Sequence, residues 1–291
     1  MSYNIGYTRY KISWKWNRGP HQEPRLSQKE GESLLKEGGL FVRNTFDFDC
    51  GEPTAYWHVI KDSFKGIEEV PSKYRGRLRK SLESYDFQIV SKEFAVKNCY
   101  ETHKAAAEHY RVKAVVPTLE QFTNHINSLD DAYDIWVCMH KDGRVAGFAI
   151  NHVIDGMCDY ESMKYHPDYL KPVSPSYGLI YTMNEYYLES LKLKYVDDGA
   201  RSITEHSDIQ QFLIDKFRFR KAFCHVQMFY KWWFKSAVLL LYPFRKFIKI
   251  LPIKAVLNME DIARHSKPVG GAKICRINLI LPQGGGYSYA A

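Results

Sequence analysis

WVCMHKDGRVAGFAINHVIDGMCDYESMKY, residues 136–165, is the stretch that decides the fold of this chain of 291 residues. Two apolar, β-branched or aromatic runs, 136–140 and 144–153, are separated by the tripeptide Lys-Asp-Gly. Because Asp and Gly tolerate positive φ angles, an Asp-Gly pair between two such runs predicts a β-hairpin. A second Asp-Gly pair, at 155–156, leads into residues 158–165, whose alternation of polar and apolar side chains predicts a third strand.

The elements that follow this stretch alternate between helices and strands. Apolar side chains recur at helical spacing in residues 177–193 and again in 209–217. Residues 195–196 and 224–230 have the apolar character of strands, and the first of these ends at an Asp-Asp-Gly turn. The expected order is therefore β-β-β-α-β-α-β, which builds a mixed sheet with helices on its faces.

The order of these elements, together with particular residues, resembles the acyltransferase domain of the GNAT superfamily. The matching segments are 165–169 (YHPDY), 178–180 (GLI) and 207–220 (SDIQQFLIDKFRFR), and the resemblance covers about residues 130 to 231. It implies an α/β (α+β) fold. The expected sheet is GNAT-like, mixed and mostly antiparallel, with a splayed central strand and helices on both faces.

In the GNAT family the loop after the splayed strand holds the pyrophosphate of acyl-CoA at a helix N-terminus. The resemblance therefore implies an acyl-CoA such as acetyl-CoA as donor. Residues 170–178 contain Pro172, Pro175 and a single glycine, where the family has several glycines. Since proline has no N–H to offer a phosphate, we expect weak CoA binding, supported in part by the charge of Lys171. The positions that the resemblance assigns to the cofactor are Met163, Tyr165, Lys171, Ser176, Tyr177, Gly178 and Ser207.

Acyl transfer to an amine requires a base for the amine proton, stabilisation of an oxyanion and an acid for the leaving group. Glu161, on the expected splayed strand, is the candidate base. Arg201 has the bidentate fork that binds a carboxylate or phosphate. His206 is a candidate acid–base group because imidazole titrates near neutrality. Tyr230 lies near the position where the resemblance implies a tyrosine that protonates the leaving thiolate.

Asp197 and Ser202 are the candidates for binding the acceptor, since neighbouring aspartates hold a cationic amine or raise one another's pKa. Several candidates also have a purely structural interpretation. Glu161 fits a solvent-facing position on a half-exposed strand, and the Asp-Asp-Gly sequence fits a plain turn. Ser207 fits the N-cap of a helix.

Residues 1–112 are expected to form a smaller N-terminal α/β lobe. Residues 70–80 (VPSKYRGRLRK), followed by a strand and a helix, resemble part of the Fem-type peptidyltransferases, which are two-lobed relatives of the GNAT family. This second resemblance implies aminoacyl-tRNA as an alternative donor. Residues 113–231 are expected to form the GNAT-like domain, and residues 232–291 a basic amphipathic segment and tail.

Positive charge is concentrated toward the end of a chain whose formal net charge is +8. Residues 216–259 contain ten Lys and Arg residues and no acidic residue. Within them, residues 232–251 combine two tryptophans, aliphatic side chains and basic groups, the composition of a helix that lies in the plane of a membrane. We therefore predict a cytoplasmic protein, peripheral at the inner face of an anionic membrane. The alternative is that these residues pack on the N-terminal lobe.

Six scattered cysteines without metal-ligand spacing predict reduced thiols and no metal site. The expected function is a GNAT-fold N-acyltransferase that acts on an amine of a sugar, sugar nucleotide, amino acid or lipid-linked envelope precursor. A non-catalytic GNAT-fold binding protein at an anionic membrane surface is the alternative. Nucleic-acid binding, DNA included, ranks last, because the basic stretches are interleaved with bulky aliphatics and lack the motifs of RNA-binding modules.

Overall fold

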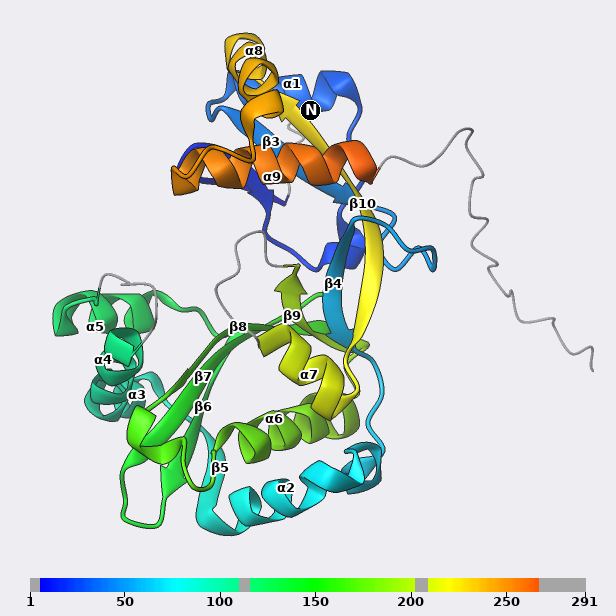
Figure 1. Ribbon diagram of the computed structural model, residues 1–291. Helices are drawn as coiled ribbons and strands as arrows, with labels where there is room; N and C mark the ends of the chain where they lie inside the picture. The colour runs from blue at the N-terminus through cyan, green and yellow to red at the C-terminus, as the bar shows by residue number, and fades with distance from the viewer. Residues whose placement is uncertain (1–5, 110–115, 202–208, 267–291) are drawn as a thin grey trace, which may run out of the picture.

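The computed structural model describes residues 6–109, 116–201 and 209–266. In this part of the chain ten strands form one sheet, in the order β1-β2-β3-β10-β4-β9-β8-β7-β6-β5. Figure 1 shows the sheet passing through two lobes, an upper one around β3 and β10 and a lower one around β6, β7 and β8. The long strand β10 (Arg220–Tyr230) joins them, because its first half pairs with β4 and its second half with β3.

The predicted hairpin and third strand are confirmed as the antiparallel strands β6, β7 and β8 of the lower lobe. At the turn between β7 and β8, Asp155 and Gly156 have φ angles of 55° and 79°, the left-handed region that this residue pair tolerates. On its other side β8 pairs with β9 in parallel, so the sheet is mixed and mostly antiparallel, as predicted. The strands of this lobe are β5 (Tyr85–Val90), β6 (Tyr133–His140), β7 (Val145–Ile154), β8 (Met157–Tyr165) and β9 (Tyr195–Ala200).

Helices cover both faces of the lower sheet (Figure 1). On one face α6 and the π-helical turn η4 that extends it bury Leu179, Ile180 and Tyr187 in the largest hydrophobic core. On the other face α3, α4 and α5 cover a second core that contains Phe122. The helical elements are α2 (Ser72–Ser84), α3 (Lys92–Asn98), α4 (Tyr100–His109), α5 (Leu119–Ser128), α6 (Ser176–Glu185), η4 (Tyr186–Ser190) and α7 (Ile209–Phe217), with short 3-10 turns η2 (Gly66–Glu69) and η3 (Pro167–Tyr169).

The upper lobe places a helix on each face of β3 and the second half of β10. α1 packs against Val42 and Phe229, whereas α9 packs against Tyr56 and Val226. Val226 and Phe229 are three residues apart and so lie on opposite faces of the strand. The elements of this lobe are β1 (Tyr7–Tyr10), β2 (Ser13–Trp16), η1 (Pro20–Gln22), α1 (Gln28–Lys36), β3 (Phe41–Phe46), β4 (Tyr56–Lys61), α8 (Trp232–Leu241), η5 (Tyr242–Phe244) and α9 (Leu251–His265).

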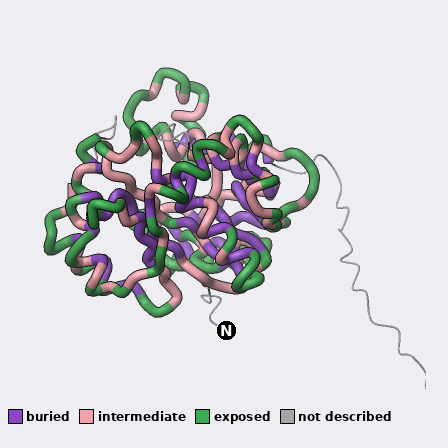
Figure 2. Tube along the Cα trace, turned by 90° about the horizontal axis from the view of Figure 1, so that it is seen from below, coloured by how far each residue is buried: buried purple, intermediate pink, exposed green. Residues whose placement is uncertain are grey.

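The strand β9 is longer than the sequence predicts. Asp197 and Asp198, expected in a turn, belong to β9 because this strand also pairs with β4, to which Asp197 and Ala200 are aligned. The expected boundary at 112/113 lies outside the described residues. From the segment before it, β5 pairs with β6 and α2 packs against α6, so both contribute to the lower lobe. Figure 2 shows the buried segments running through the interior and the exposed ones around the outside.

Candidate active site at the fork between two strands

β8 and β9 run parallel and then separate. Residues 157–159 pair with residues 195–197; beyond this point β8 continues along β7, whereas β9 follows β4. This divergence is the splay that the GNAT resemblance implies. We call the region where the two strands separate the fork. The ionisable side chains gathered there are His58, Asp159, Asp197 and Asp198.

Asp197 is the most firmly held of these side chains. Its Oδ2 lies 2.8 Å from Nδ1 of His58 on β4, and its Oδ1 accepts a 2.8 Å hydrogen bond from the backbone N–H of Gly199. Its residue surface is only 2% exposed. Both oxygens are therefore occupied, and the position of the carboxylate is fixed by two strands and a tight turn.

Asp159 lies on β8 directly in register with Asp197. Burial, followed by repulsion from Asp197 and Glu161, raises the pKa of Asp159 to about 7. The interaction with His58 acts in the opposite direction and lowers the pKa of Asp159. Within the described residues the Asp159 carboxylate has no hydrogen-bond partner. It is thus a carboxyl group that gains and loses its proton near neutrality, at the point where the strands part.

Asp198 faces the opposite side of β9, toward α7. Burial, then repulsion from Asp197 and Asp159, raises its pKa to about 8, although a hydrogen bond with Gln210 acts in the other direction. Gln210 is fixed in turn, because its amide donates to the backbone oxygens of Gly199 and Ala200, at 3.4 and 3.1 Å. The first turn of α7 therefore closes this side of the fork.

Asp159 and Asp197, in register on the two parting strands, repel one another unless a cation or a proton lies between them. A primary ammonium group there would relieve that repulsion. A carboxylate with a pKa near 7 is also well matched to removing a proton from the bound amine. The fork is therefore suited to binding an amine and activating it as a nucleophile.

No family model matches the sequence, and neither does any curated protein. Among solved structures, the chain is similar to FemX, with a TM-score of 0.56 and 10% identity over 81% of this chain and 85% of that one. It is also similar to L-PGS from Bacillus licheniformis, with a TM-score of 0.46 and 12% identity over 81% and 77%. An N-acetyltransferase, PaiA from Thermoplasma acidophilum in complex with coenzyme A, matches 38% of this chain and 75% of its own, with a TM-score of 0.30 and 14% identity.

The fold is GNAT-like, of the Fem type. Three of the site residues predicted from the sequence lie at or beside the fork: Glu161, Asp197 and Arg201. Glu161 is exposed. Burial, then the charge of Glu161 and a hydrogen bond to it, raises the pKa of Tyr133 to about 12. Arg201 donates through Nη1 to the Ala55 carbonyl at 2.6 Å and stacks 4.3 Å from the centroid of the Trp57 ring, so it anchors β9 to β4.

Of the remaining catalytic and acceptor candidates, the structure describes only Tyr230, which is not at the fork. Tyr230 lies at the far end of β10 in the upper lobe, where its hydroxyl donates to Glu260 at 2.8 Å and its ring lies beside Phe41. Burial raises its pKa, with the charge of Glu260 as the second cause. Ser202, His206 and Ser207 lie outside the described residues.

The N-terminus of α6 does not fit the pyrophosphate of acyl-CoA. The backbone N–H of Gly178 donates to Oγ of Ser81 on α2 at 3.0 Å, and that hydroxyl donates to the Ser174 carbonyl at 2.9 Å. A Cβ on Gly178 would lie 2.2 Å from the ring of Phe87 on β5. The glycine therefore permits close packing of α2 and β5 across the helix end, and it does not open a cradle for a phosphate.

The other expected cofactor positions lie in similar surroundings. Tyr177 is buried, with its ring against Phe212, and Ser176 is hydrogen-bonded to Ser174 at 2.8 Å. Met163 and Tyr165, at the end of β8, pack against the largest core. Lys171 is exposed on the loop before α6.

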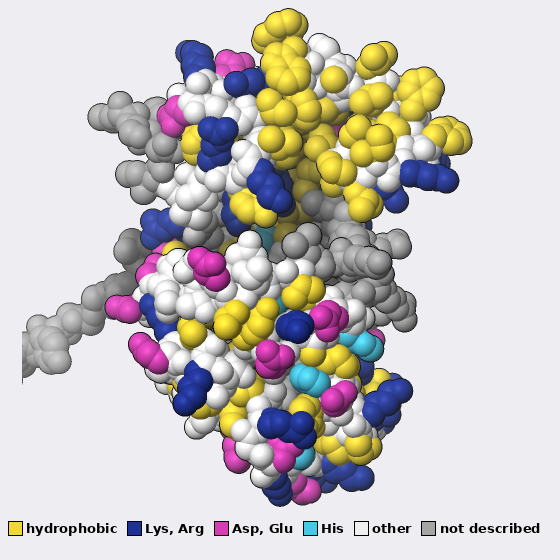
Figure 3. Space-filling model, turned by 90° about the vertical axis from the view of Figure 1, so that its left-hand side faces the viewer, with side chains coloured by type: hydrophobic (Ala, Val, Ile, Leu, Met, Phe, Trp, Pro, Cys, Tyr) yellow, Lys and Arg dark blue, Asp and Glu magenta, His cyan; other side chains and the backbone are white. Residues whose placement is uncertain are grey.

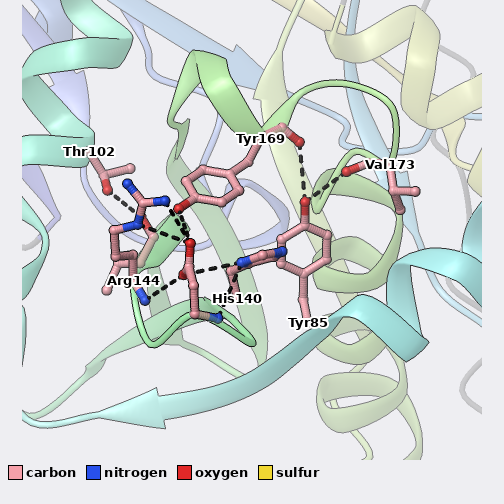
Figure 4. A network of polar contacts seen from close by, with 8 residues as sticks. Tyr85, Thr102, His140, Arg144, Tyr169 and Val173 are labelled. Carbon is pink, nitrogen blue, oxygen red and sulfur yellow. Dashed lines mark hydrogen bonds and ion pairs between the residues drawn. The ribbon is translucent and has the colours of Figure 1, made fainter.

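A cavity of about 400 Å³ lies beside that loop, and its polar side chains bind one another (Figure 4). Asp142 accepts hydrogen bonds from Arg144 at 2.7 Å and from the Tyr169 hydroxyl at 2.8 Å. The Tyr85 hydroxyl donates to the Val173 carbonyl at 2.8 Å, and burial raises the pKa of Tyr85 to about 12. These contacts fasten the loop to the β6–β7 turn through Asp142 and to β5 through Tyr85, and so hold the loop in place.

Sequence reasoning missed His58, Asp159 and Asp198 as members of the site. For Asp159 a signal exists, since it lies two residues before Glu161 and so shares its strand face. For His58 there is none, because the pairing of β4 with β9 joins segments far apart in the chain. Asp198 was assigned to a turn, and only the added pairing with β4 shows that the strand continues through it.

Proposed function

We propose that this protein is an N-acyltransferase whose acceptor amine binds at the fork. The observation that carries the proposal is the register of Asp159 with Asp197 at the point where β8 and β9 part, where burial and repulsion from Asp197 raise the pKa of Asp159 to about 7. Asp197, fixed by His58 and Gly199, offers a preorganised negative charge to an ammonium group. The acceptor class is an amine of a sugar, sugar nucleotide, amino acid or lipid-linked envelope precursor.

Asp159 is the proposed general base. Its carboxylate takes a proton from the bound ammonium group, and the neutral nitrogen forms a bond to the acyl carbonyl carbon. The bond from that carbon to the leaving oxygen or sulfur then breaks, and the leaving group takes up the proton that Asp159 accepted. The nitrogen, which carries two protons after the attack, releases the second one to solvent as the amide forms. A pKa of about 7 suits both steps, because the group is able to accept and return a proton at neutral pH.

The proposed donor is one that does not rely on the N-terminus of α6. Ser81 and Phe87 cover that helix end, which argues against an acyl-CoA held by its pyrophosphate. Aminoacyl-tRNA, the donor that the Fem-type resemblance implies, carries its acyl group as an ester and needs no such cradle. The same covered helix end also favours a second candidate, a non-catalytic GNAT-fold binding protein that has kept the fold without the donor site.

Donor competition with matched variants tests the proposal. The full-length protein is incubated with aminoacyl-tRNA or acetyl-CoA, each carrying a radioactive acyl group, and with amino sugars, amino acids or peptide-bearing sugar nucleotides as acceptors. We expect transfer from aminoacyl-tRNA, with a rate that rises with pH through about 7 and is lowered about 100-fold or more by Asp159→Asn. Asp168→Asn, at a side chain that is 80% exposed on the loop before α6, is the matched control and should retain the rate.

Two results would contradict the proposal. Full activity of the Asp159→Asn variant would remove the general base from the fork. Absence of transfer from both donors, with the protein folded, would favour the non-catalytic candidate.

A further inference from the structure

The helix α8 is apolar around most of its circumference, yet only one side of it is buried. Phe234 stacks on Phe41 with ring centroids 6.2 Å apart, and Val238, one turn later, is 4% exposed. On the outward side Trp232 is 81% exposed and Leu240 is 72% exposed. A helix that is apolar on all sides is normally enclosed by other apolar groups, so the outward side of α8 lacks a partner among the described residues.

The exposed apolar surface continues past α8 through η5 and the following loop to the start of α9. We call this surface the apolar patch. Figure 3 shows hydrophobic side chains gathered over much of the upper lobe on this face of the molecule. Its members are Trp232, Trp233, Leu239, Leu240, Phe244, Phe247, Ile250 and Leu251, which are between 47% and 81% exposed.

The patch is held in shape by polar contacts beneath it. The Tyr242 hydroxyl donates to Asp261 of α9, and Arg245 lies 3.2 Å from the same carboxylate. The guanidinium of Arg264 stacks 3.8 Å from the centroid of the Tyr242 ring. Because η5 is fastened to α9 in this way, the loop that carries Phe247 is presented outward in a defined position.

The lysines around the patch indicate which kind of surface it binds. Lys235, Lys246 and Lys249 are exposed among the apolar side chains, and none of them has an ion-pair partner in the described part of the chain. A second copy of this protein on the patch would bring the same lysines together, since a symmetric interface repeats one surface. A surface that is apolar inside and anionic at its boundary satisfies both the apolar side chains and the lysines.

We propose that the apolar patch docks the protein on an anionic lipid bilayer. α8 lies in the plane of the interface, Trp232, Leu240 and Phe247 enter the boundary between headgroups and acyl chains, and the three lysines lie among anionic headgroups. Insertion is limited to the interface, because none of the helices in the described part of the chain is long and apolar enough to cross a membrane. This inference is independent of the proposed transferase activity.

Vesicle co-sedimentation of the full-length protein tests the inference. The probes are vesicles of phosphatidylcholine alone and vesicles in which part of it is replaced by phosphatidylglycerol. We expect binding to the anionic vesicles that weakens as salt is added. Changing Lys235, Lys246 and Lys249 to Gln should lower partitioning by about 100-fold, about fivefold for each lysine. The variant Trp232→Ser, Leu240→Ser, Phe247→Ser should lower it by about tenfold or more.

Matched controls separate this surface from general attraction. Arg77→Gln, Arg79→Gln, Lys80→Gln removes three exposed basic groups from α2, and Leu119→Ser removes an apolar side chain that is 51% exposed on α5. Both variants should bind anionic vesicles like the unchanged protein. An equal loss in the α2 variant, equal binding to both vesicle types, or no binding would each overturn the proposal. So would a dimer in solution that the Trp232, Leu240, Phe247 variant abolishes, because the patch would then belong to a second copy.

Discussion

Replacing Asp198 by Asn should make the protein more stable, and increasingly so as the pH rises. The pKa of Asp198 is raised to about 8 in the folded protein from an ordinary value of 3.8. A raised carboxyl pKa means that folding disfavours the charged form. The cost is therefore absent below about pH 4, grows between about pH 4 and pH 8, and is constant above that. Asparagine cannot ionise, so the Asp198→Asn variant avoids this cost.

The interval from 3.8 to about 8 spans about four powers of ten in the acid dissociation constant, each about 1.4 kcal/mol, which sets a ceiling of about 6 kcal/mol. Asp198 is only half-buried, and the surrounding groups relax, so we expect about 2 kcal/mol of added stability above pH 8. For a chain of this length that raises Tm by about 4 °C. At about pH 5 the cost has reached only about a quarter of its full value, and the gain in Tm should be about 1 °C.

Thermal unfolding followed by circular dichroism at about pH 5 and about pH 9 measures this effect. The control is Asp168→Asn, because the Asp168 side chain is 80% exposed and its replacement should leave Tm unchanged at both pH values. A Tm for Asp198→Asn that is equal to or below that of the unchanged protein at the higher pH would refute the reasoning. A gain that does not depend on pH would also refute it, because ionisation would then not be its source.

Three further predictions concern the packing around the fork and the donor. Gly178→Ala should lower the free energy of unfolding by about 1–3 kcal/mol in urea titrations, because the added Cβ meets the Phe87 ring. Adding Phe87→Leu to this variant should recover part of the loss. Equal stability of the single and the double variant would contradict this prediction. Arg201→Ala should lower the free energy of unfolding by about 1–2 kcal/mol, because it removes the hydrogen bond to Ala55 and the stacking on Trp57. In the same assay Arg201→Lys should recover less than half of that loss. Calorimetry should give a Kd of about 0.1 mM or weaker for acetyl-CoA, whereas low-micromolar binding would show that the end of α6 opens.

Local signals predict the elements of the lower lobe well. The two Asp-Gly pairs mark the turns between β6, β7 and β8, where Gly143, Asp155 and Gly156 have positive φ angles that these residue types tolerate. The helical spacing that starts near Tyr177 places α6, and the order of elements predicts a mixed sheet, which the parallel pairing of β8 with β9 confirms. The splay that follows is implied by the GNAT resemblance.

The composition of the site depends on contacts between distant segments. His58 reaches the fork because β4 pairs with β9, and Ser81 reaches the end of α6 because α2 packs across it. Neither contact leaves a pattern in the local sequence. The resemblance placed a cofactor loop at Gly178, but whether a glycine opens space or allows another side chain to fill it is decided by the neighbouring element, here Phe87.

The pairing of β10 has a consequence for how the chain folds. β3 and β4 lie early in the chain, yet in the described part of the sheet they are hydrogen-bonded to one another's neighbour β10 and not to each other, and β10 is made more than 150 residues later. Contacts across such a separation close long loops and form slowly. During synthesis one edge of β3 and both edges of β4, whose other neighbour is β9, therefore remain open to other chains for most of the time that the ribosome needs. The growing chain is expected to depend on chaperones until β10 emerges, and refolding from denaturant should give more aggregate as protein concentration rises.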